Sequence, residues 1–127
     1  MKKIILFLLL LFPFSAFAQQ TINPAAIPFS PGQTLSISVT SSPSAGQLVG
    51  VSFTPTLTSA QVMVTNTGAN VCFVAFGATS AVSATTSSTP IPAGAIEIFT
   101  INQNSQYVSA VTSSSTTTCY FTAGVGN

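Results

Sequence analysis

The run QVMVTNTGANVCFVAF, residues 61–76, is the stretch that most directly indicates how this chain folds. Val62 and Val64 lie two residues apart, so in a strand they would share one face. Residues 66–70 then supply asparagine and glycine, which tolerate the positive φ angles of tight turns. Residues 71–76 are nearly all apolar, as expected for a strand that is covered on both faces. The run therefore predicts a β-hairpin and an all-β protein.

Short β-prone runs alternate with turn-forming clusters along the rest of the chain, and helical periodicity is almost absent. In residues 34–40 hydroxyl residues separate the apolar ones, which predicts a strand with one face in the core. Residues 106–112 and 116–122 flank a serine turn and predict a second hairpin. Further strands are expected at 47–54 and 95–101. Seven or eight strands in a chain of this length predict a small antiparallel β-sandwich of jelly-roll or immunoglobulin-like type.

The strand expected at 95–101 should present Ile96 and Ile98 to the core and Glu97 to solvent. The remaining segments are expected to be irregular, with a loop or weak edge strand at 79–89, a rigid turn at 90–94 and a flexible tail at 123–127.

The first eighteen residues have the three-part layout of a secretory signal peptide. Lys2 and Lys3 precede the apolar run 4–14 and the small-residue pattern of 16–18. Because a membrane-spanning helix needs about 20 apolar residues, we expect cleavage and no stable membrane span; a retained anchor is the alternative. The expected domains are a signal peptide at 1–18, an extended N-terminal arm at 19–33 and a single β-sandwich domain at 34–127.

Glu97 is the only side chain after residue 18 that is charged at neutral pH. A serine nucleophile would lack a neighbouring base, and glycoside hydrolysis would lack its second carboxylate. Binding to a phosphate backbone depends on lysine and arginine, and neither occurs beyond the leader. The composition therefore predicts a protein that is not an enzyme, carries no metal or other cofactor and has no nucleic-acid partner.

Five side chains remain as candidates for a structural or binding role: Cys72, Cys119, Glu97, Tyr107 and Tyr120. In an exported protein an even cysteine count favours a disulfide, with two buried free thiols as the alternative. The two tyrosines could stack on a sugar ring, although strand tyrosines more often pack within a sheet. The glutamate could contact a ligand or weakly bind calcium; limiting edge-to-edge strand pairing is its more common role.

Several stretches of the C-terminal half occur in an informative order. These are Asn66-Thr67-Gly68, Phe73-Val74-Ala75-Phe76-Gly77, Pro90-Ile91-Pro92-Ala93-Gly94 followed by Glu97 and Phe99-Thr100, and Tyr120-Phe121-Thr122-Ala123-Gly124. From Gln61 onwards the chain thereby resembles a group of small β-sandwich proteins encoded in tailed phages and prophages. The resemblance implies a virion or virion-associated structural part without catalytic residues. The leader and the cysteines depart from that pattern and fit a version adapted for export.

Together these features favour an exported, non-catalytic structural or assembly subunit, phage- or prophage-derived, that forms a homo-oligomer or larger assembly or docks onto a partner. The arm at its N-terminus, residues 19–32, could add as a strand to a neighbour's open sheet edge. The alternative is a secreted module that binds cell-surface carbohydrate or a host protein, and a pilus subunit is a third possibility. The expected location is the periplasm, the cell exterior or a virion.

Overall fold

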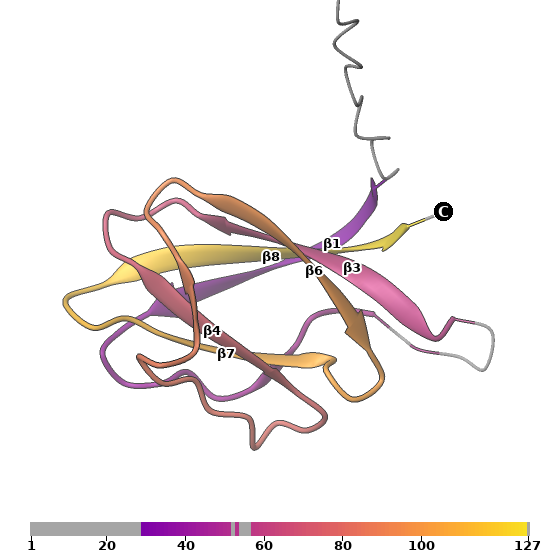
Figure 1. Cartoon of the computed structure of the whole chain (residues 1–127), viewed down its shortest axis with the longest axis horizontal. Helices are drawn as coiled ribbons and strands as arrows, with labels where there is room; N and C mark the ends of the chain where they lie inside the picture. Colours follow the sequence, from indigo (N-terminus) through magenta and orange to yellow (C-terminus); the bar gives the residue numbers. More distant parts are fainter. Residues whose placement is uncertain (1–28, 52, 54–56, 127) are drawn as a thin grey trace, which may run out of the picture.

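Two antiparallel four-stranded sheets, arranged as a small β-sandwich, make up the computed structural model, which describes residues 29–51, 53 and 57–126 (Figure 1). The strands, in chain order, are β1 (Phe29–Val39), β2 (Gln47–Leu48), β3 (Ser59–Asn66), β4 (Cys72–Gly77), β5 (Thr89–Ile91), β6 (Ile96–Asn102), β7 (Tyr107–Val111) and β8 (Thr117–Gly126). Sheet A has the order β1-β8-β3-β6, and sheet B has the order β2-β7-β4-β5. The prediction of an all-β fold is confirmed. The expected signal peptide and residues 19–28 of the expected arm lie outside the described residues.

None of the described segments forms a helix that is long and apolar enough to cross a membrane.

One core lies between the two sheets and takes side chains from both. Sheet A contributes Ile37, Val39, Val62, Val64, Cys119 and Phe121, and sheet B contributes Cys72, Val74, Ile91, Val108 and Ala110. Successive side chains of a strand point to opposite faces, so every second residue reaches this core. The alternation expected in 34–40 is confirmed, since Ile37 and Val39 are buried and Leu35 packs against the core.

Both connections that the sequence predicts to be hairpins are instead arches that cross from one sheet to the other. β3 lies in sheet A, whereas β4 lies in sheet B, and β7 and β8 are divided in the same way. The hairpin predictions are wrong because turn residues mark where a strand ends but do not determine which strand it pairs with. The expected positive φ angles are also absent from residues 66–70; in the second arch Ser115 adopts one of 56°.

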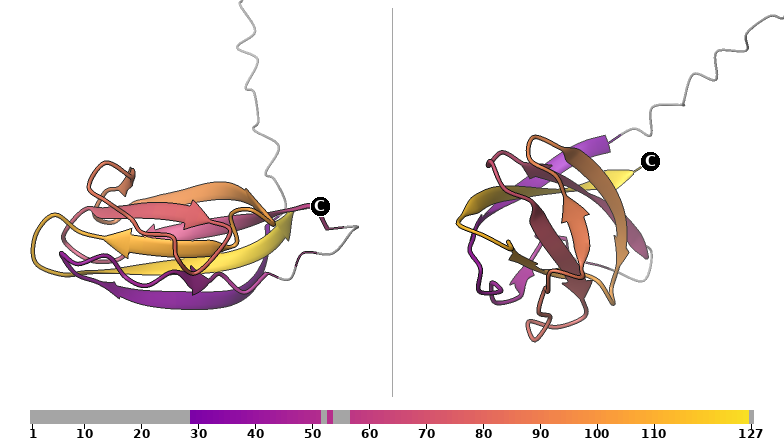
Figure 2. Two further views of the ribbon diagram at one scale, coloured as in Figure 1. Left: turned by 90° about the horizontal axis from the view of Figure 1, so that it is seen from below. Right: turned by 60° about the vertical axis from the view of Figure 1, so that its left-hand side comes forward.

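The two ends of the described chain are paired strands. β1 begins at Phe29, so residues 29–33 of the expected arm belong to sheet A, and β8 continues to Gly126 through most of the expected tail. Phe29 is the register partner of Gly126, and the start of β1 and the end of β8 lie together at one end of the molecule (Figure 2). Residues 123–126 of the expected tail are therefore part of sheet A.

The part of the outer face of sheet B that lies over β7 is covered by the chain itself. Ala84, in the connection from β4 to β5, is fully buried and its amide donates to the hydroxyl of Ser109 on β7, at 3.0 Å. That hydroxyl in turn donates to the carbonyl oxygen of Ser44, at 2.7 Å. Two loops are thus fastened onto β7, which explains why β7 is buried on both faces: Val108, Ser109, Ala110 and Val111.

Candidate functional site

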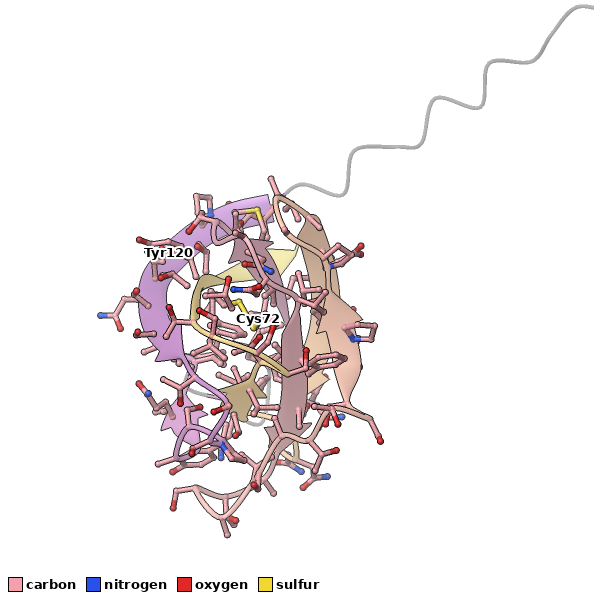
Figure 3. All side chains as sticks on the ribbon, turned by 90° about the vertical axis from the view of Figure 1, so that its left-hand side faces the viewer. Cys72 and Tyr120 are labelled. Carbon is pink, nitrogen blue, oxygen red and sulfur yellow. A yellow bond between two sulfur atoms is a disulfide. The ribbon has the colours of Figure 1, made fainter. Side chains whose placement is uncertain are left out.

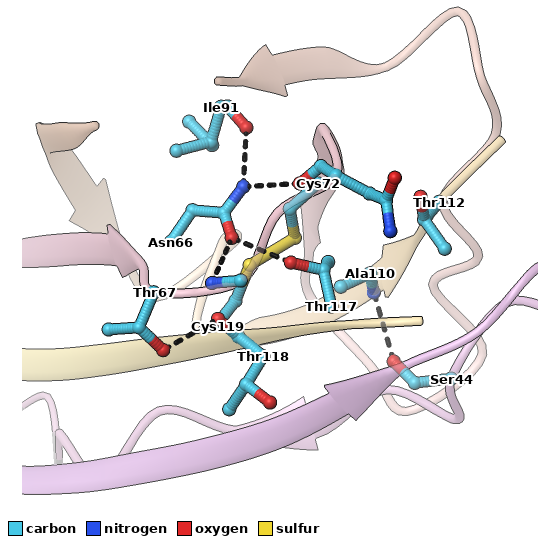
Figure 4. Close-up of a disulfide and its surroundings, with 12 residues drawn as sticks. Ser44, Asn66, Thr67, Cys72, Ile91, Ala110, Thr112, Thr117, Thr118 and Cys119 are labelled. Carbon is cyan, nitrogen blue, oxygen red and sulfur yellow. Dashed lines mark hydrogen bonds between the residues drawn. A yellow bond between two sulfur atoms is a disulfide. The ribbon is translucent and has the colours of Figure 1, made fainter. Parts of the chain in front are cut away.

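The two cysteines join the sheets at the end of the sandwich where both arches lie (Figure 4). Cys72 is the first residue of β4 and Cys119 lies in β8, and both are fully buried. They form a disulfide that links positions 47 residues apart. The predicted bridge is confirmed, and the alternative of two free thiols is removed. Because the bond is buried and joins two sheets, we interpret it as structural.

Asn66 is a buried polar side chain beside this disulfide, and it makes four hydrogen bonds (Figure 4). Its amide nitrogen donates to the carbonyl oxygens of Asn70, at 2.8 Å, and Ile91, at 2.9 Å. Its carbonyl oxygen accepts from the amide of Gly68, at 3.1 Å, and the hydroxyl of Thr117, at 2.8 Å. One side chain thus connects β3, the first arch, β5 and β8.

The two arches also contact each other directly. The side-chain amide of Asn70 donates to the carbonyl oxygen of Thr116, at 2.8 Å. The backbone amide of Thr67 donates to the carbonyl oxygen of Thr118, at 3.0 Å. A Cβ atom on Gly68 would collide with Thr117, whose Cα would lie only 2.9 Å away. Glycine is therefore needed here for close approach and not for a positive φ angle.

Sequence reasoning placed Asn66 in a turn and missed its burial. A signal was present, because Val62, Val64 and Asn66 follow one another at every second position. All three are fully buried, so the inward-facing phase of β3 continues through the asparagine.

The outer face of sheet A carries exposed apolar side chains. Ile96 and Ile98 on β6 are 59% and 55% exposed. Ile98 is the register partner of Met63 on β3, and Ile96 is that of Thr65, which on its other side faces Tyr120 on β8. We call Met63, Ile96, Ile98 and Tyr120 the apolar stripe. It crosses three of the four strands of sheet A.

The prediction that Ile96 and Ile98 face the core is therefore wrong. β6 follows β3 in continuous register, with Glu97 opposite Val64 and Phe99 opposite Val62. Because these valines face the core, alternate residues of β6 face it too, and the isoleucines point outwards. Phe99 contacts Phe76 across the sandwich, with ring centroids 5.3 Å apart. That contact and the burial of Ile101 fix the phase of the strand.

The three expected ligand-contacting residues do not share one site. Tyr107 lies on β7 of sheet B, half-buried, between Leu48 and Gly77. Tyr120 lies on the outside of sheet A, whereas Cys72 lies inside the sandwich (Figure 3). Glu97 is exposed because β6 is an edge strand, although it belongs to the opposite face of sheet A from Tyr120.

The described residues form no cluster of histidine, cysteine, aspartate or glutamate that could hold a metal ion. A shallow pocket of about 370 Å³ lies between the start of β1 and the end of β8. It is lined by Ser30, Pro31, Gly32, Gln33, Gly50, Val51, Leu57, Ala123 and Gly124. These residues include no ionisable side chain, so the pocket offers shape but no acid–base chemistry.

Replacing both cysteines, Cys72→Ala with Cys119→Ala, should lower the free energy of unfolding by about 4 kcal/mol, because the unfolded chain loses a constraint of this loop length. Chemical denaturation of the variant and the oxidised wild type measures the difference. Wild type unfolded under reducing conditions should match the variant. A loss below about 1 kcal/mol would contradict the structural role of the bridge.

Asn66→Ala should lower the free energy of unfolding by about 3 kcal/mol or more, because it leaves buried donors and acceptors without partners. The matched control is Asn104→Ala, since Asn104 is exposed and its replacement should change stability by less than about 0.5 kcal/mol. Denaturant titrations of the wild type and the two variants measure these differences in the free energy of unfolding. Equal stabilities for the two variants would refute the assigned role of Asn66.

No family model, no curated protein and no solved structure matches this chain.

Proposed function

We propose that this protein is an exported, non-catalytic structural subunit that acts by packing against other molecules, above all against copies of itself. The observation that carries this proposal is the contrast between the two sheets. Loops cover the outer face of sheet B over β7, where Ser109 is fully buried, although Leu48 on the edge strand β2 is 48% exposed. The outer face of sheet A keeps Ile96 and Ile98 more than half exposed. An exposed apolar stripe on a small domain is typical of an interaction surface.

The charge distribution supports contact between identical copies. Glu97 is the only charged side chain of the described residues, so like-charge repulsion between copies is very weak. The same scarcity removes the acids and bases on which most catalysis depends. Packing and hydrogen bonding are the interactions that this chain is equipped to make.

The strand order supports a jelly-roll assignment over an immunoglobulin-like one. β1 pairs with β8, β2 with β7, β3 with β6 and β4 with β5, and this nesting is the arrangement we assign to a jelly roll of eight strands. Jelly rolls occur in viral capsid proteins and in lectins, so the assignment accommodates a phage-derived structural part without requiring it. The buried disulfide supports export, because such bonds persist in oxidising compartments.

A carbohydrate-binding module is the second candidate, favoured by the surroundings of Tyr120. Tyr120 is 38% exposed on the outer face of sheet A. The neighbours in register are Ser36 on β1 and Thr65 on β3. An aromatic ring among hydroxyl groups suits a sugar, whose apolar face can stack while its hydroxyls form hydrogen bonds.

The secreted chain should sediment as a discrete species heavier than a monomer as its concentration rises. Because the contacts are apolar, this mass should not fall when ionic strength is raised, whereas charge-driven association would weaken. Analytical ultracentrifugation at low and high salt measures both effects. A monomer at every concentration would overturn self-association.

If the second candidate is correct, the protein should bind a defined glycan, and Tyr120→Ala should abolish that binding because the stacking surface is lost. Tyr107→Ala serves as the matched control, since Tyr107 lies on the other sheet and its replacement should leave glycan binding unchanged. A glycan array followed by calorimetry tests both. A blank array, or equal loss in the two variants, would eliminate this candidate.

A further inference from the structure

The four sheet edges differ in how well they are protected against pairing with another strand. β1 contains Pro31 and a register shift between Pro31 and Thr34. β2 has only two residues, and β5 has three, one of which is Pro90. Proline, irregular register and short length all discourage strand addition. β6 has none of these features: it has seven residues, contains no proline and keeps continuous register with β3.

The backbone of β6 presents a regular row of unpaired groups at this edge. The amide of Asn66 donates to the carbonyl oxygen of Ala95, at 3.0 Å, beside a bulge at Gly94, which has a φ angle of 74°. In an antiparallel ladder the residues that exchange hydrogen bonds alternate. The carbonyl of Ala95 faces β3, and so do the backbone groups of Glu97 and Phe99. Those of Ile96, Ile98 and Thr100 therefore face away from β3.

We propose that two copies of this chain join through their β6 strands, antiparallel and about a two-fold axis at Ile98. This inference rests on the proposed function and specifies its interface. The backbone groups of Ile98 pair with those of Ile98 of the partner subunit, and those of Ile96 pair with those of Thr100 of the partner subunit. The two sheets A then form one continuous sheet, and both pairs of exposed isoleucines lie together on its outer face.

The single carboxylate excludes the register next to this one. An axis at Glu97 would place two like charges directly opposite each other, which destabilises a strand pair. An axis at Ile98 instead places Glu97 opposite Phe99 of the partner subunit. The Cα atoms of the two glutamates are then separated by about 8 Å, from the strand rise and the strand spacing. A second copy is thus accommodated without any opposite charge on the partner.

The remaining edges make the assembly a closed dimer. An edge that pairs with itself about a two-fold axis is used up by one partner. Growth into a filament would need a second open edge, and β1, β2 and β5 are each short or interrupted. The proposed product is therefore a dimer with no further strand addition.

The first test compares Ile98→Lys with Ser36→Lys by sedimentation velocity. Both positions are exposed on the outer face of sheet A and both variants gain one positive charge, but Ser36 lies on β1. Ile98→Lys should raise the dimer dissociation constant about 100-fold, because two lysines meet at the axis and an apolar contact is lost. Ser36→Lys should remain a dimer like wild type.

The outcomes separate this inference from the proposed function. A wild-type dimer that persists in Ile98→Lys, or that Ser36→Lys weakens equally, would refute pairing through β6 while leaving self-association intact. A wild-type protein that stays monomeric would overturn both the β6 dimer and the proposed self-association. A monomer is also the result expected if the β6 edge pairs with a strand from another protein. Circular dichroism of both variants confirms that each is folded.

A second test fixes the register by cross-linking. In a glutathione redox buffer, Ile98→Cys should form a covalent dimer, because opposite residues of a hydrogen-bonded pair have Cα atoms about 5.5 Å apart, within disulfide range. Glu97→Cys should not, because its counterpart lies about 8 Å away. Cross-linking of Glu97→Cys but not of Ile98→Cys, read on a non-reducing gel, would refute the proposed axis.

Discussion

Asn66 lies where the chain leaves sheet A for sheet B, and its four hydrogen bonds hold that crossing together. An arch interrupts both ladders, so its backbone groups need partners from elsewhere. The side chain of Asn66 supplies these partners, because its NH₂ group donates two hydrogen bonds and its carbonyl oxygen accepts two. Its neighbour in register is Cys119, so the polar network and the disulfide reinforce the same end of the sandwich. The nested strand order requires both arches, and both are secured here.

Much of the fold could be predicted from the sequence, but strand partners and the phase of one strand could not. Most strand positions follow from local alternation, although β2 is only two residues of the strand expected at 47–54 and β5 runs into the turn expected at 90–94. The even cysteine count, with the expectation of export, favoured the pairing that the structure has. The sheet to which β4 belongs depends on contacts made far along the chain. In β6 apolar residues occupy both phases, Ile96 and Ile98 in one and Phe99 and Ile101 in the other. The phase is decided by the contact of Phe99 with Phe76, which lies on the other sheet. The local sequence of β6 therefore carries no signal for it. The apolar stripe was missed for that reason.

The two outer faces solve the problem of a nearly uncharged surface in different ways. Sheet B is covered over β7 by two loops, which hydrogen bonds of Ser44 and Ser109 fasten to that strand. Sheet A exposes hydroxyl groups along β1 and β8, and the hydroxyls of Thr34 and Thr122 lie 2.9 Å apart in a cross-strand hydrogen bond. These groups keep that half of the sheet hydrated. The apolar stripe lies mainly on β3 and β6 and reaches β8 only at Tyr120, so the exposed surface of sheet A is largely polar towards β1 and apolar towards β6.

Glu97 gains a more specific role from its position than its sequence context suggests. A charge on an edge strand is a common device against edge-to-edge pairing, and this one lies on the only long, uninterrupted edge without proline among the described strands. A single charge cannot block an edge completely, because it opposes only those registers that place it against another charge. It therefore removes some pairings and leaves others. On a chain with one carboxylate, such an edge residue restricts the geometry of association more effectively than it prevents association.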